Sequence, residues 1–300
     1  MTFVIAERAR NAETAGVSIV FGPVQSRRFG RSLGINHLPR KECSYSCVYC
    51  QLGSTARTSI ERRAFCETEA IVEGVRAVRK PYDVISFVPD GEPTLDLNLG
   101  AHIAAVKQFG APVAVITNGS LLWMESVRHD LEQADIVSIE IDAVDERVWR
   151  RIDRPSPALS IDLVIDGIRA FARERRGKLW TQTMLVRGES GDGFDDLENV
   201  AAFIGEIAPD RVCISVPTRP PADLAIHAAD GLRLARALEL LPTAELMTHD
   251  PGAACVQTTD ELLSVLAVHP LRAETVEPDL IDESRIRRIE HAGDVFLTLR

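Results

Sequence analysis

A regular alternation of short apolar runs with segments of helical periodicity constrains the fold of this chain most strongly. Strands are predicted at 31–37, 83–88, 113–117, 135–141, 178–186 and 211–216. Helices are predicted at 67–79, 99–109, 122–133, 160–175, 195–207 and 228–240. Nearly continuous apolar strands separated by helices are typical of a parallel sheet that is covered by helices. The sequence therefore predicts an α/β fold built from six strand–helix units.

Six units are fewer than the eight of a closed barrel, which leaves two candidate architectures. One is an open, partial (β/α)6 TIM-like barrel, and the other is a doubly wound sheet. Both bind ligands at the carboxyl ends of the strands. Polar, glycine-rich and proline-rich segments follow the predicted strands at 89–94, 118–120, 142, 187–192 and 217–221. We therefore expect an active site at that edge of the sheet.

The end of the chain has a different pattern, which predicts a second unit at 258–300 after a barrel domain at 1–245. Short helical patterns at 258–269, about 273–281 and about 283–291 precede a strand-like end at 294–300. This order is typical of a small helical or winged-helix-like unit. The alternative is a terminal cap that packs on the barrel. Because no basic recognition helix is evident, we favour a role of this unit in docking over a role in DNA recognition.

The composition indicates a globular protein without a membrane segment. Hydrophobic residues make up 45% of the chain and charged residues 26%, which is ordinary for globular domains. No apolar run is long enough to cross a bilayer. Residues 1–14 hold four charged side chains and no apolar stretch, so no signal peptide is expected. These observations predict a cytoplasmic location and no membrane partner.

Positive charge is concentrated near the N-terminus of an acidic chain. The net charge is -10, yet residues 1–63 hold ten Lys and Arg against four Asp and Glu. The basic side chains include Arg27, Arg28, Arg31 and the pair Arg62 and Arg63. One interpretation is a solvated basic face. The other is a site for a carboxylate or phosphate, through which a structured RNA would dock.

Three of the six cysteines lie within eight residues, in the sequence CSYSCVYC at 43–50. Cys43, Cys47 and Cys50 can surround one metal centre, whereas the scattered Cys66, Cys213 and Cys255 are expected to be small buried hydrophobes. A structural zinc ion needs four ligands, and His37 is the candidate that would complete that set. A cubane with four irons would instead be bound at three of them, which leaves one iron open to another ligand.

The CxxxCxxC spacing, with Tyr49 before the last cysteine, resembles the motif of radical S-adenosylmethionine (SAM) enzymes. The six strand–helix units resemble the partial barrel of that family. Two further segments, FGPVQSRRFGRSLGIN at 21–36 and VPDGEPTL at 88–95, resemble a branch of bacterial and archaeal radical SAM proteins related to the wyosine-forming tRNA enzymes. The resemblance extends over most of residues 18–220.

The resemblance implies a [4Fe-4S] cluster bound by Cys43, Cys47 and Cys50, with SAM chelating the open iron. In the family, an external donor reduces the cluster and SAM is cleaved to methionine and a 5′-deoxyadenosyl radical. That radical abstracts hydrogen from a substrate. The substrate here is unknown, with tRNA a candidate through the region of Arg27, Arg28 and Arg31.

The resemblance also implies SAM contacts at the ends of the strands. Glycine lets backbone approach a ligand closely, and Glu92 can pair with the SAM ammonium. Ser138, Glu140 and Asp142 alternate and would face one way on a regular strand. The full set of candidate contacts is Tyr49, Asp90, Gly91, Glu92, Pro93, Thr94, Asn118, Ser138, Glu140, Asp142, Gln182 and Val216.

Two departures separate this chain from the wyosine-forming enzymes. Those enzymes carry a second cluster on upstream cysteines and hold pyruvate on a lysine. This chain has no cysteine before Cys43, and Lys41 is the only lysine among residues 1–50. The wyosine-forming reaction is therefore not expected. The rival hypothesis is a zinc- or cluster-containing binding module whose C-terminal unit engages nucleic acid or a protein.

Overall fold

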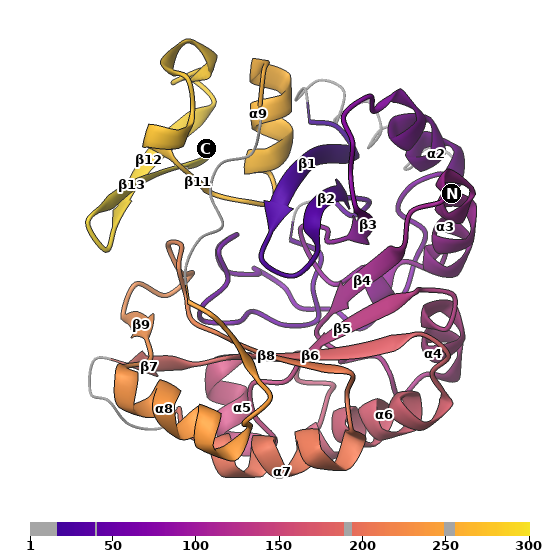
Figure 1. Ribbon diagram of the computed structural model, residues 1–300, viewed down its shortest axis with the longest axis vertical. Helices are drawn as coiled ribbons and strands as arrows, with labels where there is room; N and C mark the ends of the chain where they lie inside the picture. The colour runs from indigo at the N-terminus through magenta and orange to yellow at the C-terminus, as the bar shows by residue number, and fades with distance from the viewer. Residues whose placement is uncertain (1–16, 40, 189–193, 249–255) are drawn as a thin grey trace.

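One curved sheet of eight strands forms the core of the computed structural model, which describes residues 17–39, 41–188, 194–248 and 256–300. In spatial order its strands are β1 (Val20–Ser26), β2 (Gly30–Ile35), β3 (Val84–Phe87), β4 (Val113–Thr117), β5 (Ile136–Glu140), β6 (Lys178–Met184), β8 (Arg211–Ser215) and β10 (Glu245–Met247). β1 pairs antiparallel with β2, and all the other neighbours pair in parallel. The sheet curls into a half-barrel (Figure 1).

Helices cover the outer face of the half-barrel (Figure 1). They are α2 (Thr68–Ala77), α3 (Leu99–Val106), α4 (Glu125–Leu131), α5 (Glu146–Ile152), α6 (Ile161–Glu174), α7 (Leu197–Ile207) and α8 (Gly231–Leu240), with 3-10 turns η1 (Pro93–Leu95) and η2 (Lys107–Phe109). β7 (Val186–Gly188) and β9 (Ile226–Ala228) form a small two-stranded sheet that is not hydrogen-bonded to the main sheet. The predicted partial barrel is confirmed, and the doubly wound alternative is wrong.

Helix α6 illustrates how the sequence pattern produces this arrangement. Its apolar Ile161, Val164, Ile168 and Phe171 recur at helical spacing, and all are buried against the main core. The side chain of Ser160 accepts a hydrogen bond from Leu163 N and caps the first turn. Apolar periodicity and a local cap thus agree, which explains why this helix was predicted with nearly correct bounds.

The structure contains elements that the sequence analysis did not predict. Strand β1 forms a hairpin with β2, whereas only one strand was predicted in this region. Phe21 on β1 lies over Gly34 on β2, where an added Cβ would come within 2.0 Å of the ring. Helix α5 and the edge strand β10 were also missed. β10 has only three residues, which is too short for a periodic signal.

The C-terminal residues form one helix and a small sheet. Helix α9 (Thr259–Leu266) is followed by β11 (Leu271–Arg272), the turns η3 (Ala273–Thr275) and η4 (Pro278–Leu280), β12 (Ile286–His291) and β13 (Asp294–Leu299). The three strands pair antiparallel in the order β11-β13-β12. The helical pattern predicted at about 283–291 is therefore wrong, because pairing with β13 makes this segment a strand.

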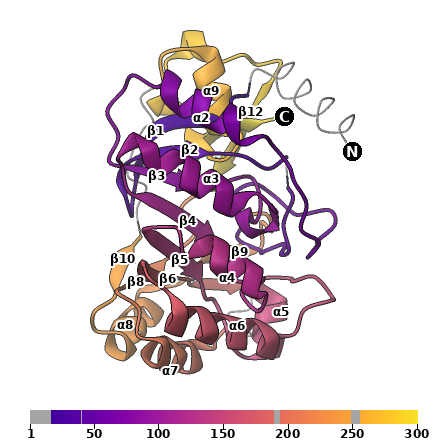
Figure 2. The same ribbon diagram turned by 90° about the vertical axis from the view of Figure 1, so that its right-hand side faces the viewer.

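This C-terminal unit shares a hydrophobic core with the hairpin of the main sheet. Phe21 of β1 belongs to one buried cluster together with Leu263 of α9 and Leu297 of β13. Figures 1 and 2 both place α9 beside β1. The observed packing corresponds to the cap alternative. The boundary between a domain at 1–245 and a unit at 258–300 stays a prediction, because residues 249–255 lie outside the described residues.

Among the described residues, no helix is both long and apolar enough to cross a membrane. The absence of a signal peptide was inferred from residues 1–14, which also lie outside the described residues. The cytoplasmic location stays a prediction.

The shared core predicts that truncation on α9 destabilises the protein. Leu263 has no exposed surface, so we expect Leu263→Ala to lower the free energy of unfolding by about 2–5 kcal/mol. Leu232 on α8 is 84% exposed, and Leu232→Ala should change it by less than about 0.5 kcal/mol. Urea unfolding measures both values. Equal, small losses would show that α9 does not contribute to the core.

Candidate active site

The loop that carries the three clustered cysteines is fixed by backbone hydrogen bonds. Val48 N donates to Ile152 O at 2.8 Å, and Ser46 N donates to Asp153 O at 3.0 Å. Val48 is buried and packs against Ile152 at the end of α5. The loop thus lies against the turn after α5, and its conformation is held by contacts distant in sequence.

The three cysteines line one cavity of about 300 Å³ at the carboxyl ends of the strands. Gly91 and Glu92 reach it from the segment after β3, and Asn118 from the segment after β4. Glu140 and Gln182 come from the ends of β5 and β6. Ligand binding at this edge is what a parallel sheet with short strand-to-helix loops favours.

Nitrogen donors approach two of the cysteine sulfurs. Lys41 Nζ lies 3.2 Å from Cys50 Sγ. Cys43 Sγ is 3.5 Å from the backbone N of Tyr45 and 3.8 Å from Asn118 Nδ2. Burial raises the pKa of the Cys43 thiol to about 12, because a lone thiolate is poorly solvated there. A metal centre reverses this effect by deprotonating the thiols that bind it.

Tyr49 is held beside the cysteines by Asp142. Its hydroxyl donates to Asp142 Oδ2, while Asp142 Oδ1 accepts from Met184 N at 2.7 Å. Burial, with the nearby charge of Glu140, raises the pKa of Asp142. Asp142 borders a small hollow behind the cavity instead of the cavity itself. Its carboxylate therefore positions the tyrosine ring.

The segment before Cys43 crosses directly over Gly91. Glu42 and Gly91 form an isolated parallel bridge, and Glu92 N donates to Glu42 O at 2.9 Å. A Cβ on Gly91 would lie only 1.8 Å from the Glu42 carbonyl oxygen. Glycine is required here by the close approach of two backbone segments.

The carboxylate of Glu92 is fully engaged by donors of the chain. Oε1 accepts from Thr94 N at 3.0 Å, from Thr94 Oγ1 at 2.6 Å and from Thr117 Oγ1 at 2.6 Å. Oε2 accepts from Asn118 N at 2.8 Å. Burial raises the pKa of Glu92, whereas these donors favour its charged form. The side chain thereby joins the ends of β3 and β4.

An ion pair crosses the inner face of the sheet. Arg28 Nη1 donates to Ser138 Oγ at 3.0 Å and to Glu140 Oε1 at 3.1 Å. Gln182 Nε2 donates to Glu140 Oε2 at 2.7 Å. Ser138 and Glu140 thus share a face of β5, as their alternation predicted. Arg28, one of the candidate residues for contact with RNA, lines the cavity.

The predicted SAM contacts fall into two groups in the structure. Those that line the cavity with the cysteines are Tyr49, Gly91, Glu92, Asn118, Glu140, Gln182 and Val216. Those that support the cavity from behind or lie outside it are Asp90, Pro93, Thr94, Ser138 and Asp142. Asp90 lines a second, larger cavity on another side of the loop.

Several residues near the cysteines were not selected from the sequence. Cys47 Sγ donates to Asp153 Oδ1 at 3.4 Å, across 106 residues of sequence. Arg219 and His269 line the cavity, and both contact Gln51, the residue after Cys50. Lys41 could have been identified from the sequence, because it lies two residues before Cys43. The other contacts depend on long-range folding that no local pattern indicates.

His37 does not face the three cysteines. Its ring packs against Phe87 and His102, and its Nε2 lies 3.8 Å from Asp96 Oδ2. Burial lowers the pKa of His37 to about 4, so the ring is neutral. The suggestion that His37 completes a zinc site on the cysteine loop is therefore wrong.

Residues 39–201, more than half of the chain, match the radical SAM superfamily. The chain belongs to this superfamily. The matched segment contains the CxxxCxxC motif and strands β3 to β6.

Two proteins of known sequence resemble the chain over nearly its full length. It is 34% identical to UPF0026 protein MJ1312 of Methanocaldococcus jannaschii, with 93% of this chain and 95% of that protein covered. It is 32% identical to a UPF0026 protein of Helicobacter pylori, with 91% of each covered.

The half-barrel also resembles a solved structure that contains S-adenosylmethionine. The crystal structure of Streptococcus suis SuiB bound to S-adenosylmethionine aligns with a TM-score of 0.53 at 14% identity. The alignment covers 82% of this chain and 54% of SuiB, so the chain spans about half the length of that protein. At this identity the likeness confirms the fold alone.

The cofactors of this radical SAM protein are a [4Fe-4S] cluster and SAM, as in the rest of the superfamily. The residues present fit both groups. Three thiols from one loop reach one cavity, and nitrogen donors approach two of the sulfurs. Hydrogen bonds to the sulfurs are one of the means by which proteins tune such clusters. Beside them, Gly91 adds no side chain to the cavity wall.

The close passage at Gly91 predicts that Gly91→Ala disturbs the cysteine loop. The added methyl group must displace Glu42, so we expect a loss of stability of about 1–3 kcal/mol and less iron bound per chain after anaerobic reconstitution. Gly205→Ala on α7 is the matched control, because nothing lies within 4 Å of its Cβ. Wild-type iron content in Gly91→Ala would contradict the prediction.

Proposed function

We propose that the chain is a radical SAM enzyme in which Cys43, Cys47 and Cys50 bind the cluster. With an external electron donor, the bound cofactors supply a 5′-deoxyadenosyl radical that abstracts hydrogen from a substrate. The observation that carries this proposal is the shared cavity, which brings the three thiols and seven predicted SAM contacts together.

In this proposal the residues of the cavity wall have distinct tasks. The three cysteines would hold the [4Fe-4S] cluster beside the bound SAM. The backbone at Gly91 and the side chain of Asn118, which line the same cavity, are proposed to hold the SAM amino acid group. Glu140 and Gln182 offer polar atoms for the ribose, and Val216 an apolar surface for adenine.

Other predicted contacts act as positioning residues. Glu92 is proposed to fix the strand ends instead of pairing with the SAM ammonium, since its carboxylate already accepts four hydrogen bonds. Ser138 supports Arg28, and Asp142 orients Tyr49. Arg28 lines the cavity as one half of an ion pair with Glu140, so the two charges fix each other's position in the wall.

The C-terminal unit is proposed to keep water from the reacting groups. Val265, Val268 and His269 from α9 and the segment after it line the cavity. Gln51 Nε2 donates to Val268 O at 2.8 Å, which ties the end of the cysteine loop to this unit. Exclusion of water protects a reactive species from side reactions.

The proposal predicts SAM cleavage that depends on the motif cysteines. Reconstituted protein, reduced anaerobically with dithionite and given SAM, should form 5′-deoxyadenosine, measured by chromatography and mass spectrometry. Cys47→Ala should reduce this product to the level of a protein-free control. Cys213→Ala, a change of a buried cysteine on β8, should retain it. Cluster-loaded wild-type protein that forms no 5′-deoxyadenosine would refute radical catalysis and favour the binding-module hypothesis.

A relationship to the wyosine-forming branch, with tRNA as substrate, stays a prediction. The arginines on which tRNA docking was based have partners within the chain. Arg31 pairs with Asp83 at 2.7 Å, and Arg27 Nη1 donates to Met247 O at 2.7 Å. The side chain of Arg31 is 51% exposed, compared with 15% for that of Arg28.

If tRNA docks on the region of Arg27, Arg28 and Arg31, the affinity of the protein for tRNA should fall steeply with salt concentration, because phosphate contacts release counterions. Arg31→Ala should then weaken binding and reduce the salt slope by about one. Arg169→Ala on the outer helix α6 is the control and should leave both unchanged. Gel-shift titrations at several salt concentrations measure this. Binding that is insensitive to salt would contradict docking through these arginines.

A further inference from the structure

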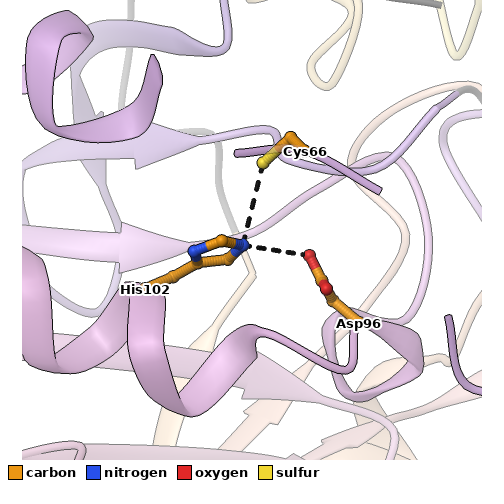
Figure 3. A group of neighbouring side chains, drawn as sticks. All are labelled: Cys66, Asp96 and His102. Carbon is orange, nitrogen blue, oxygen red and sulfur yellow. Dashed lines mark hydrogen bonds and ion pairs between the residues drawn. The ribbon is translucent and has the colours of Figure 1, made fainter. Parts of the chain in front are cut away.

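A second group of metal-binding side chains lies apart from the cysteine loop (Figure 3). It consists of Cys66 before α2, Asp96 after η1 and His102 within α3, whose ligand atoms all lie within 4.8 Å of one another. Cys66 Sγ is 3.8 Å from His102 Nε2, and Asp96 Oδ2 is 3.3 Å from the same nitrogen. The side chains of Asp96 and His102 have no exposed surface.

The orientation of His102 distinguishes this group from a catalytic triad. In a nucleophile–histidine–acid relay, the acid and the nucleophile contact opposite nitrogens of the ring. Here both approach Nε2, as Figure 3 shows, while Nδ1 lies 2.9 Å from Thr68 Oγ1. A histidine that binds metal commonly has its other nitrogen hydrogen-bonded in this way.

Hydrogen bonds among the described residues leave a buried oxygen of this group unsatisfied. Nε2 of His102 carries at most one proton, so it can donate to only one of its two neighbours. Asp96 Oδ2 is buried and accepts no hydrogen bond from any residue that the structure describes. His37 Nε2 lies 3.8 Å from the same Asp96 oxygen. Buried polar atoms without partners are costly, and a cation between them removes that cost.

The donor set points to zinc. A thiolate, an imidazole and a carboxylate together suit Zn²⁺, which binds sulfur at about 2.3 Å and nitrogen or oxygen at about 2.0–2.2 Å. Separations of 3.3 and 3.8 Å between donor atoms are of the size that two such bonds at a tetrahedral angle produce. Cys66 and His37 line a cavity of about 1000 Å³, which provides an entry path for an ion.

We propose that Cys66, Asp96 and His102 bind one Zn²⁺, with water in the fourth position and His37 beside that water. Thr68 fixes the imidazole through Nδ1. The ion joins the chain before α2 to α3 and to the segment that follows Glu92. This site is separate from the cluster cysteines, so zinc binding at it does not depend on whether the protein catalyses a radical reaction.

Metal analysis of the anaerobically purified holoenzyme tests the proposal. After equilibration with ZnCl₂ and gel filtration, we expect one zinc per chain in addition to iron, with X-ray absorption at the zinc edge showing one sulfur ligand. Cys66→Ala and His102→Ala should lose the zinc but keep the iron. Cys213→Ala should keep both. Wild-type protein without zinc, or zinc without a sulfur ligand, would overturn the assignment.

A milder variant covers the case in which the ligand variants do not fold. Thr68→Ala retains all three ligands and removes only the contact to Nδ1. We expect its zinc affinity to fall by about 10–100-fold in competition with a chromophoric chelator. Iron is measured before and after each titration, so loss of the cluster is detected separately. Unchanged zinc affinity in Thr68→Ala would contradict the proposed role of His102.

Discussion

The buried carboxylate of Glu92 connects three parts of the chain that must meet for the cavity to form. The carboxylate accepts hydrogen bonds from Thr94, Thr117 and Asn118. The backbone N–H of the same residue donates to Glu42 O. Since Glu42 immediately precedes Cys43, this contact sets where the cysteine loop begins. Four donors offset the cost of burying the charge, and removal of any one would leave a buried group without its partner. The GEPT sequence is therefore a structural junction as well as a wall of the cavity.

The structure also explains why positive charge is concentrated near the N-terminus of an acidic chain. Arg28 pairs with Glu140, Arg31 with Asp83, and Arg62 with Asp130. In each case a basic residue from the N-terminal segment meets an acidic residue from a later part of the chain. The excess of positive charge in residues 1–63 thus complements the acidic remainder within the fold. A charge bias along a sequence is by itself weak evidence for a polyanion-binding surface, because pairing inside the chain produces the same bias.

Prediction from sequence succeeded where the signal is local. The six strand–helix units follow from apolar periodicity, and the cysteine motif identified one wall of the cavity. It failed at residues 286–291, where a short pattern with isoleucines three apart suits a helix and a strand alike and pairing with β13 decides. It also missed Asp153 and His269, because only the folded chain brings them to the cysteines. For Glu92, the residue was identified but its four internal hydrogen bonds were not.

Closure of the cavity depends on the end of the chain. Gln51 follows the last cysteine and contacts both Arg219 after β8 and His269 after α9. Burial, with the charge of Arg219, lowers the pKa of His269 to about 3, so its ring remains neutral and can accept a hydrogen bond. The cysteine loop is thus held at its start by the segment after β3 and at its end by the C-terminal unit. A half-barrel leaves one side of its interior open, and here α9 with its following segment supplies that side. The cavity is complete only when the β1–β2 hairpin and the C-terminal unit pack together.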